Sequence, residues 1–282
     1  MRYFLACVAL LWAQDKPAYL FYSVKGKPLS YGAVLKILQK ADVVLFGELH
    51  NNPIAHWLEY ELARDLYAVK KDSLLIGMEM LEADQEEALL RYRKGELSLE
   101  KLGEEIRLWP NFRTDYAPIL EWARQHHVPV YATNAPRSLA REVSQKGAAA
   151  WESWGAAQRR YVAPIPFPRL DTLPSYQKMN EMARSHGMEP EPFRLAQMLK
   201  DATMAYRITQ AWRPGTVFFH LNGRYHSDYH EGIAAYLRVY NPALKVVVLT
   251  TEEAADPRTY KPAQPPVADI LLVVPETMTK TH

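Results

Sequence analysis

The feature that most constrains the fold of this chain is a series of short, almost continuous apolar runs that alternate with longer segments of helical spacing. The runs at 42–46, 74–80, 128–132 and 245–250 have the length of strands that are covered on both faces. Between the first three runs, apolar residues recur at three- and four-residue steps, as in the segment that Asn52-Pro53 opens. This order predicts an α/β fold with a mostly parallel sheet flanked by helices.

The alternation breaks between residues 136 and 192. This stretch carries Trp151, Trp154 and a proline-rich loop at 163–168, and it has no clear strand pattern. It predicts a helical lid inserted into the core, before a long helix from 193 to 212 returns the chain to the sheet. The predicted core domain therefore consists of residues 14–135 and 193–282, with the lid at 136–192.

The first thirteen residues have the features of a signal peptide. Met1-Arg2 is a basic start, residues 4–12 are apolar, and the chain becomes polar after Ala13. We expect export to the periplasm or the extracellular space; a first buried strand is the alternative. Attachment of lipid at Cys7, the only cysteine, is the one route to a membrane anchor, because no other run has the ~18 apolar residues of a spanning helix.

Charge and simple motifs exclude several classes of function. The formal net charge is only +2 and there is no long basic run, so nucleic acid is not an expected partner. No Gly-x-Ser-x-Gly motif occurs, and cleavage after Ala13 would leave no cysteine for a thiol nucleophile.

Polar side chains lie at the ends of the predicted strands. Glu48 and His50 follow the first run, Glu79 ends the next, and Asn222, Gly223 and His226 follow the strand at 216–221. The carboxyl ends of parallel strands share one edge of a sheet, where ligands bind. Five of the nine histidines fall in two such segments, at 50, 56, 220, 226 and 230. The sequence therefore predicts a Glu/His cleft at this edge.

Two kinds of chemistry are open to this group. Glu48, His50, Glu79 and His226 form a ligand set that suits Zn²⁺, Mn²⁺, Co²⁺ or Fe²⁺. In a metal-free site, Glu48 would hold His50 in one tautomer and His50 would act as general base on water. Each side chain also has an ordinary structural role open to it, such as capping a helix. His230 is four residues from His226 and could share its face of a helix.

Four segments together resemble one protein family: VVLFGELHNNPIAH, LIGMEMLEADQ, FRLAQMLKDATMAYRI and FFHLNGRYHSDYHEGI. In this order they are similar to the ChaN family of haem-binding, iron-regulated exported proteins, which groups with Tiki and TraB proteins and erythromycin esterases. The family's motifs fall on Gly47, Glu48, His50, Glu79, Gly223 and His226, and a helix motif falls on Gln197 and Asp201.

The resemblance implies two functions, and a third hypothesis stands beside them. A ChaN-like protein would bind haem or iron as a small-molecule ligand, with haem at a homodimer interface. The Tiki and esterase relatives imply a hydrolase, metal-dependent or Glu/His-based, that acts on an ester, amide or peptide substrate. A scaffold that keeps the site residues is the third. Asn222, Gly223, Asp201 and His230 are the predicted cofactor-binding residues, and Tyr131, Tyr161 and Tyr176 are haem-ligand candidates in or beside the lid.

Overall fold

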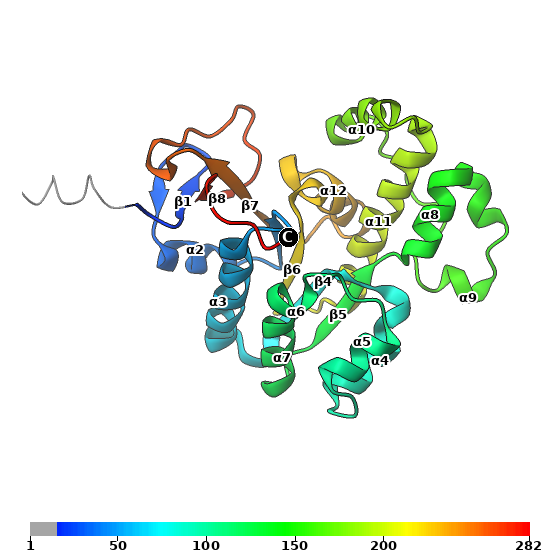
Figure 1. Ribbon diagram of the computed structural model, residues 1–282, viewed down its shortest axis with the longest axis horizontal. Helices are drawn as coiled ribbons and strands as arrows, with labels where there is room; N and C mark the ends of the chain where they lie inside the picture. Colours follow the sequence, from blue (N-terminus) through cyan, green and yellow to red (C-terminus); the bar gives the residue numbers. More distant parts are fainter. Residues whose placement is uncertain (1–15) are drawn as a thin grey trace, which may run out of the picture.

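The computed structural model describes residues 16–282, whose strands form one eight-stranded sheet (Figure 1). The predicted signal peptide and Cys7 lie outside the described residues. The strands are β1 (Leu20–Ser23), β2 (Pro28–Leu29), β3 (Val43–Glu48), β4 (Leu74–Glu82), β5 (Val130–Asn134), β6 (Val217–Gly223), β7 (Val246–Ala254) and β8 (Ile270–Pro275). Their order in space is β2-β1-β8-β7-β3-β6-β4-β5. The strands from β8 to β5 are parallel, and β1 pairs antiparallel with both β8 and β2. The predicted α/β class is confirmed.

Helices cover both faces of the sheet. The α-helices are α2 (Tyr31–Leu38), α3 (Pro53–Lys70), α4 (Glu86–Arg93), α5 (Leu99–Glu105), α6 (Phe112–Asp115), α7 (Ala117–Gln125), α8 (Arg137–Lys146), α9 (Ala156–Arg159), α10 (Pro174–Ser185), α11 (Pro190–Ala211) and α12 (Gly232–Tyr240). Short 3₁₀ turns are η1 (Lys71–Ser73), η2 (Ala83–Gln85), η3 (Gly147–Glu152), η4 (Arg224–His226), η5 (Asp228–His230) and η6 (Pro257–Thr259). One apolar layer packs α3 and α7 on the sheet, and the other packs α11 and α12 on the opposite face.

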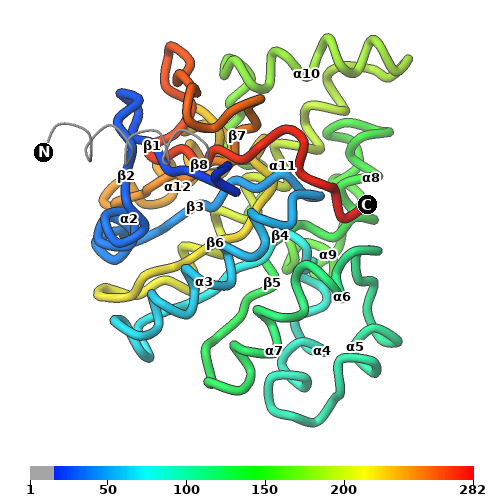
Figure 2. The backbone as a smooth tube through the Cα atoms, turned by 60° about the vertical axis from the view of Figure 1, so that its left-hand side comes forward, coloured from blue at the N-terminus to red at the C-terminus, as the bar shows by residue number. Residues whose placement is uncertain are grey.

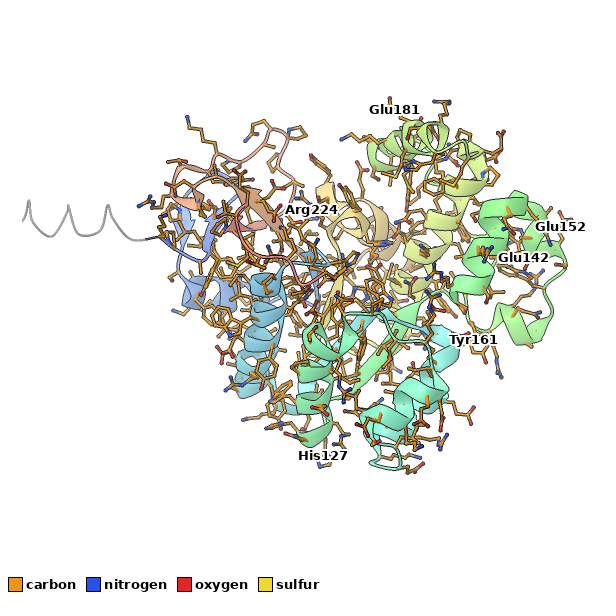
Figure 3. All side chains as sticks on the ribbon, viewed as in Figure 1. His127, Glu142, Glu152, Tyr161, Glu181 and Arg224 are labelled. Carbon is orange, nitrogen blue, oxygen red and sulfur yellow. The ribbon has the colours of Figure 1, made fainter. Side chains whose placement is uncertain are left out.

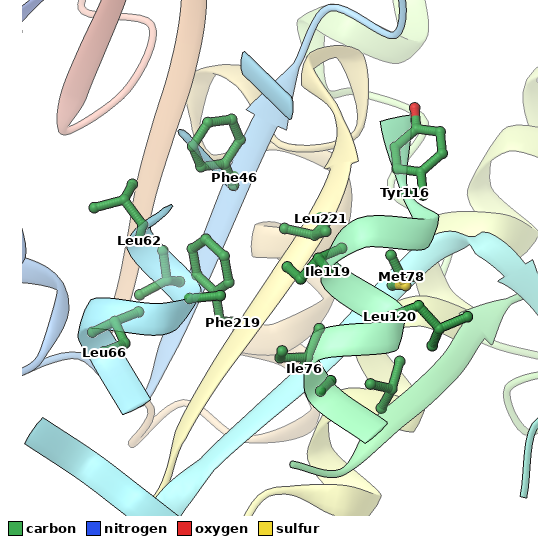
Figure 4. Packing of buried hydrophobic residues seen from close by; sticks show 14 of the residues in the cluster. Phe46, Leu62, Leu66, Ile76, Met78, Tyr116, Ile119, Leu120, Phe219 and Leu221 are labelled. Carbon is green, nitrogen blue, oxygen red and sulfur yellow. The ribbon is translucent and has the colours of Figure 1, made fainter. Parts of the chain in front are cut away.

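The core explains why the central strands carry so few polar residues. β3 pairs with β6 on one side and β7 on the other, and all six of its residues are buried. Figure 4 shows Phe46 and Phe219 packed near Leu62 and Leu66 of α3. Such burial contributes about 1.5–3 kcal/mol for each large apolar side chain. β3 is therefore covered on both faces, as its apolar run predicts.

Two strands extend further than their apolar runs suggest. β3 continues through Gly47 to Glu48, which pairs with Gly223 of β6. β4 continues to Glu82, and its register against β5 shifts between Met78 and Glu82. Glu48 and Glu79 are therefore strand residues rather than loop residues, which fixes their backbones in the sheet.

The segment 136–192 contains helices and turns but no strand among its residues. Trp154, Phe167 and Tyr176 belong to the same apolar layer as α11, which begins at Pro190. Figures 1 and 2 both show α10 at the outer end of the molecule, next to α11. The role of the segment 136–192 as a lid stays a prediction. Within residues 16–282, no helix combines the length and apolar character that crossing a membrane requires.

Candidate functional site

Glu48 is the centre of a buried group on the α3 side of the sheet. Its side chain points to the same face as Phe46, because side chains alternate along a strand. Oε1 accepts a hydrogen bond from the Tyr116 hydroxyl at 2.6 Å and lies 2.6 Å from Nδ1 of His50. Oε2 lies 3.0 Å from Nδ1 of His56. Figure 4 shows Tyr116 at the end of the apolar layer, with its hydroxyl turned away from the aliphatic side chains. Glu48 therefore holds both imidazoles, those of His50 and His56, through their Nδ1 atoms.

The charges of this group follow from its contacts. Burial alone would raise the pKa of Glu48, but hydrogen bonds and charge from His50 and His56 hold it well below its usual value. Burial would lower the pKa of His56, yet Glu48 and Glu59 raise it to about 11. The pKa of His50 is also raised, because Glu48 and Glu79 outweigh its burial. His50 keeps 39% of its side chain exposed, so it is the imidazole that a ligand reaches.

A second group lies around Glu79, on the α11 side. Oε2 of Glu79 accepts a hydrogen bond from the Gly223 backbone at 2.7 Å, and Oε1 lies 3.1 Å from Nε2 of His226. Nδ1 of His226 contacts Oδ1 of Asp201, whose Oδ2 accepts a hydrogen bond from Tyr176 at 2.7 Å. The α10 segment thus joins this group through Tyr176, which removes that phenol from the haem-ligand candidates.

The Glu79 group behaves as an ion pair. Burial would raise the pKa of Glu79, but the charge and hydrogen bond of His226 bring it to about 2. Burial would lower the pKa of His226, but Glu79 and Asp201 raise it to about 10. The pKa of Asp201 is raised, mainly by burial. The contacts of His226 with Glu79 and Asp201 therefore favour the charged form of its imidazole.

The two groups meet at Gly223. A Cβ on this residue would lie 2.5 Å from Nε2 of His50 and 3.6 Å from Oε2 of Glu79. Only glycine lets the imidazole approach the backbone this closely. The four predicted residues Glu48, His50, Glu79 and His226 therefore lie around the carboxyl ends of β3, β4 and β6, as two acid–imidazole groups with Gly223 between them.

The predicted four-ligand metal set does not gather around one point in this arrangement. Glu79 and His226 use their atoms on each other, on Gly223 and on Asp201. Within residues 16–282, ligand atoms of at least three acidic, histidine or cysteine side chains come within 4.8 Å of one another in one group, which consists of Glu48, His56 and Glu59. The four-residue metal site stays a prediction.

Two predicted cofactor-binding residues have internal partners. Asn222 is fully buried, and its amide contacts His220, the Gly223 carbonyl and Ser227. Nε2 of His230 lies 3.3 Å from Oδ1 of Asp269. Asn222 therefore supports the backbone at Gly223, whereas His230 pairs with Asp269.

Sequence reasoning missed three side chains of the Glu48 group. Glu59 is 1% exposed and lies 3.4 Å from Nδ1 of His56. Asp115 lies 3.3 Å from Nε2 of His56, and Tyr116 bonds Glu48. The available signal was that His56 and Glu59 occur three residues apart among the apolar positions of one helix.

The carboxyl edge of the sheet is distinct from two open hollows on the molecular surface. One is lined by residues of α4 and α7 and includes Arg93 and His127; the other lies beside α2 and includes Lys36 and Lys245. Figure 3 shows His127 at the far end of the molecule from Arg224, the residue that follows Gly223.

The fold and the site define an α/β protein with paired acid–imidazole groups at the carboxyl edge of a mainly parallel sheet. Residues 34–237 match the family model described as "Haem-binding uptake, Tiki superfamily, ChaN". The chain belongs to this family. A search of curated protein sequences found no match.

Two solved structures resemble this chain. The structure described as "Cofacial heme binding to ChaN of Campylobacter jejuni" is 17% identical, with a TM-score of 0.70, and the match covers 91% of this chain and 96% of that one. A mutant of the erythromycin esterase EreC in its open conformation is 12% identical, with a TM-score of 0.48, over 90% of this chain and 83% of that one. At 17% identity, the likeness to the C. jejuni structure establishes the fold alone.

Proposed function

We propose that this protein binds haem at the open edge beside Gly223. The observation that carries the proposal is the position of Tyr225 in η4, directly after the sheet edge, with 80% of its surface exposed. Tyrosine is one of the side chains that ligate haem iron. Membership of a haem-binding family and the haem-bound C. jejuni ChaN structure support the same ligand.

The other tyrosine candidates fit haem less well. Tyr176 is buried and bonded to Asp201, while Tyr161 is partly buried against Arg160. Tyr229 is 40% exposed, but Lys178 lies over its ring. Within the described residues no hydrogen bond holds the Tyr225 hydroxyl, so this phenol is free to meet a ligand.

Haemin titration of the full chain tests this proposal. We expect a Soret band that saturates near one haem per chain, and at least a tenfold loss of affinity in Tyr225→Phe. The matched control Tyr161→Phe removes the same hydroxyl from the 136–192 segment and should bind like the wild type. Loss of the band in His50→Ala with Tyr225→Phe unaffected would move the iron to the imidazole, and absence of any Soret change would refute haem binding.

We also propose that haem brings two copies of the chain together. A macrocycle held by an exposed residue such as Tyr225 keeps one face uncovered, and the C. jejuni structure is described as cofacial. Sedimentation velocity should therefore show a monomer without haemin and a dimer with it. A monomer at saturating haemin contradicts this assembly and leaves the haem proposal intact.

Hydrolysis of an ester, amide or peptide is a second candidate, favoured by the contact between Glu48 and His50. Glu48 holds Nδ1 of His50 at 2.6 Å, which leaves Nε2 as the atom for proton transfer. The predicted metal-dependent version would need the donor atoms of Glu79 and His226 to leave their present partners.

An ester and amide panel tests the second candidate. His50→Ala and Glu48→Gln should each lower kcat/KM by about 10²-fold or more, the range of general acid–base catalysis. Tyr161→Phe is again the control. Turnover that is equal in His50→Ala and the wild type would remove the hydrolase from consideration.

Export remains a proposal based on the first thirteen residues of the sequence. We propose cleavage after Ala13 and a periplasmic or extracellular location. Mass spectrometry of the secreted chain should find Gln14 as the first residue. A lipid on Cys7 would give a different mass and a membrane-anchored form.

A further inference from the structure

We propose that Glu48, His56 and Glu59 form a closed binding site for one divalent transition-metal ion behind the sheet edge. This site differs from the predicted four-ligand set, with which it shares only Glu48. It does not depend on haem binding or on hydrolysis.

The three side chains come from two rigid elements. Glu48 is the last residue of β3, and His56 and Glu59 are three residues apart on α3, which places them on the same helix face. Their exposed fractions are 1%, 6% and 1%. A site built on a buried strand and a buried helix face has a fixed geometry.

The distances suit an ion of this class. Nδ1 of His56 lies 3.0 Å from Oε2 of Glu48 and 3.4 Å from Oε2 of Glu59, and the three ligand atoms lie within 4.8 Å of one another. Bonds of about 2.1 Å at tetrahedral or octahedral angles separate neighbouring ligand atoms by about 3.0–3.4 Å. A small shift of the Glu59 carboxylate would therefore complete the coordination.

One oxygen atom of the group lacks a partner. Within residues 16–282, Oε1 of Glu59 is buried and accepts no hydrogen bond, whereas Oε2 of Glu48 lies 3.0 Å from Nδ1 of His56. No lysine or arginine of this part of the chain pairs with either carboxylate. A buried carboxylate oxygen without a partner is costly, and a metal ion bound by both oxygens of Glu59 would satisfy it.

The other nitrogen of His56 is already occupied. Nε2 lies 3.3 Å from Oδ2 of Asp115 and 3.2 Å from the His50 carbonyl, so it is the nitrogen that carries a proton. When a metal ion displaces the proton on Nδ1, this nitrogen directs its lone pair at the ion between the two carboxylates. Asn111 and Thr281 bond the same Asp115 oxygen at 2.7 Å and 2.8 Å. This is the carboxylate–histidine support that metal-bound histidines have in proteins.

The types of donor atom limit which metal ions the site can bind. One imidazole and two carboxylates suit Zn²⁺, Mn²⁺ or Fe²⁺, and Glu59 supplies a fourth donor if it binds through both oxygens. Because the site is closed, the ion would be acquired during folding and would add to stability. It would also position Glu48, whose Oε1 holds Tyr116 and His50.

The test is to refold the full chain from urea with a chelator, with Zn²⁺ or with Mn²⁺, and to measure metal content by mass spectrometry after gel filtration. We expect about one equivalent of Zn²⁺ or Mn²⁺ and a higher Tm than in the chelated sample. Glu59→Gln, which keeps the shape of the side chain, should lower the retained metal at least tenfold. Glu61→Gln removes the same charge from the partly exposed side of α3 and should retain the metal.

Three outcomes overturn the proposal. They are no retained metal in the wild type, metal retained by Glu59→Gln, and metal lost in His226→Ala but kept in His56→Ala, which would assign the ion to the predicted four-ligand set. If the Glu59 and His56 variants do not fold, the wild type decides, because equal Tm values with chelator and with metal also overturn the site. Haemin binding is measured separately, so its failure does not affect this result.

Discussion

Gly223 occupies the position at which the acid–imidazole groups of Glu48 and Glu79 approach each other. Its amide donates to Glu79, and its Cα faces the His50 ring. The absence of a side chain is therefore a steric requirement of the site, since this residue has no positive φ that would call for glycine.

Gly223→Ala should lower the free energy of unfolding by about 1–3 kcal/mol, the usual cost of overpacking a buried site. The new Cβ would lie 2.5 Å from Nε2 of His50, and the ring must move away. Gly32→Ala is the matched control: it lies in α2 with nothing within 4 Å, and it should raise stability by about 0.5–1 kcal/mol. Urea unfolding measures both, and equal effects of the two substitutions would contradict the close approach.

His220 links stability to acid pH. Burial lowers its pKa from 6.5 to about 4, so the folded state holds the neutral ring between Thr133 and Asn222. This contribution is complete above pH 6.5 and is lost as the pH falls towards 4. The stability of the wild type relative to His220→Gln should therefore fall by up to about 3 kcal/mol over that window. Urea unfolding at several pH values checks this, and a constant difference between the two proteins would argue against a neutral buried ring.

Helix α3 carries two buried side chains of the Glu48 group, His56 and Glu59. Asn52 caps it by accepting hydrogen bonds from Ile54 and Ala55, and Pro53 starts it, as the sequence predicted. The helix was predictable because its apolar spacing and cap are local features. The inward direction of His56 and Glu59 was not, because their partner Glu48 lies on another element.

Asn52→Ala should cost about 1 kcal/mol of stability, since the first amides of α3 lose their acceptor. Asn52→Ser restores a capping oxygen and should recover most of the loss. Denaturant unfolding of both variants tests the cap. If Ser and Ala destabilise equally, packing of the buried Asn52 side chain outweighs the capping hydrogen bonds.

For the whole molecule, the sequence predicted the parallel α/β class but not the neighbours of each strand. Apolar periodicity reports burial, and it does not report which strands pair. The two-residue β2 and the antiparallel β1 were beyond this signal, because β1 pairs with β8 from the other end of the chain. The shared sheet edge was predictable, because parallel strands impose it, whereas the separation of the site residues into two groups depends on tertiary packing.

Phe219→Ala should lower the free energy of unfolding by about 3–5 kcal/mol, because the ring is fully buried against Phe46 in the centre of the sheet. Val69 lies on α3 and is 55% exposed, so Val69→Ala should change the free energy of unfolding by less than about 0.5 kcal/mol. Thermal and urea unfolding compare the two. A loss below 1 kcal/mol for Phe219→Ala would mean that the core collapses around the missing ring.

The alternation of side chains along β3 and β4 has a mechanical consequence. Glu48 faces the layer that contains α3, and Glu79 faces the layer that contains α11. The carboxyl edge of the sheet is therefore the place where these two layers of the molecule meet. A ligand that contacts both layers would hold them together and oppose their relative movement. Its binding should then raise the Tm of the entire protein. A ligand that contacts one layer alone would leave the movement between the layers unchanged.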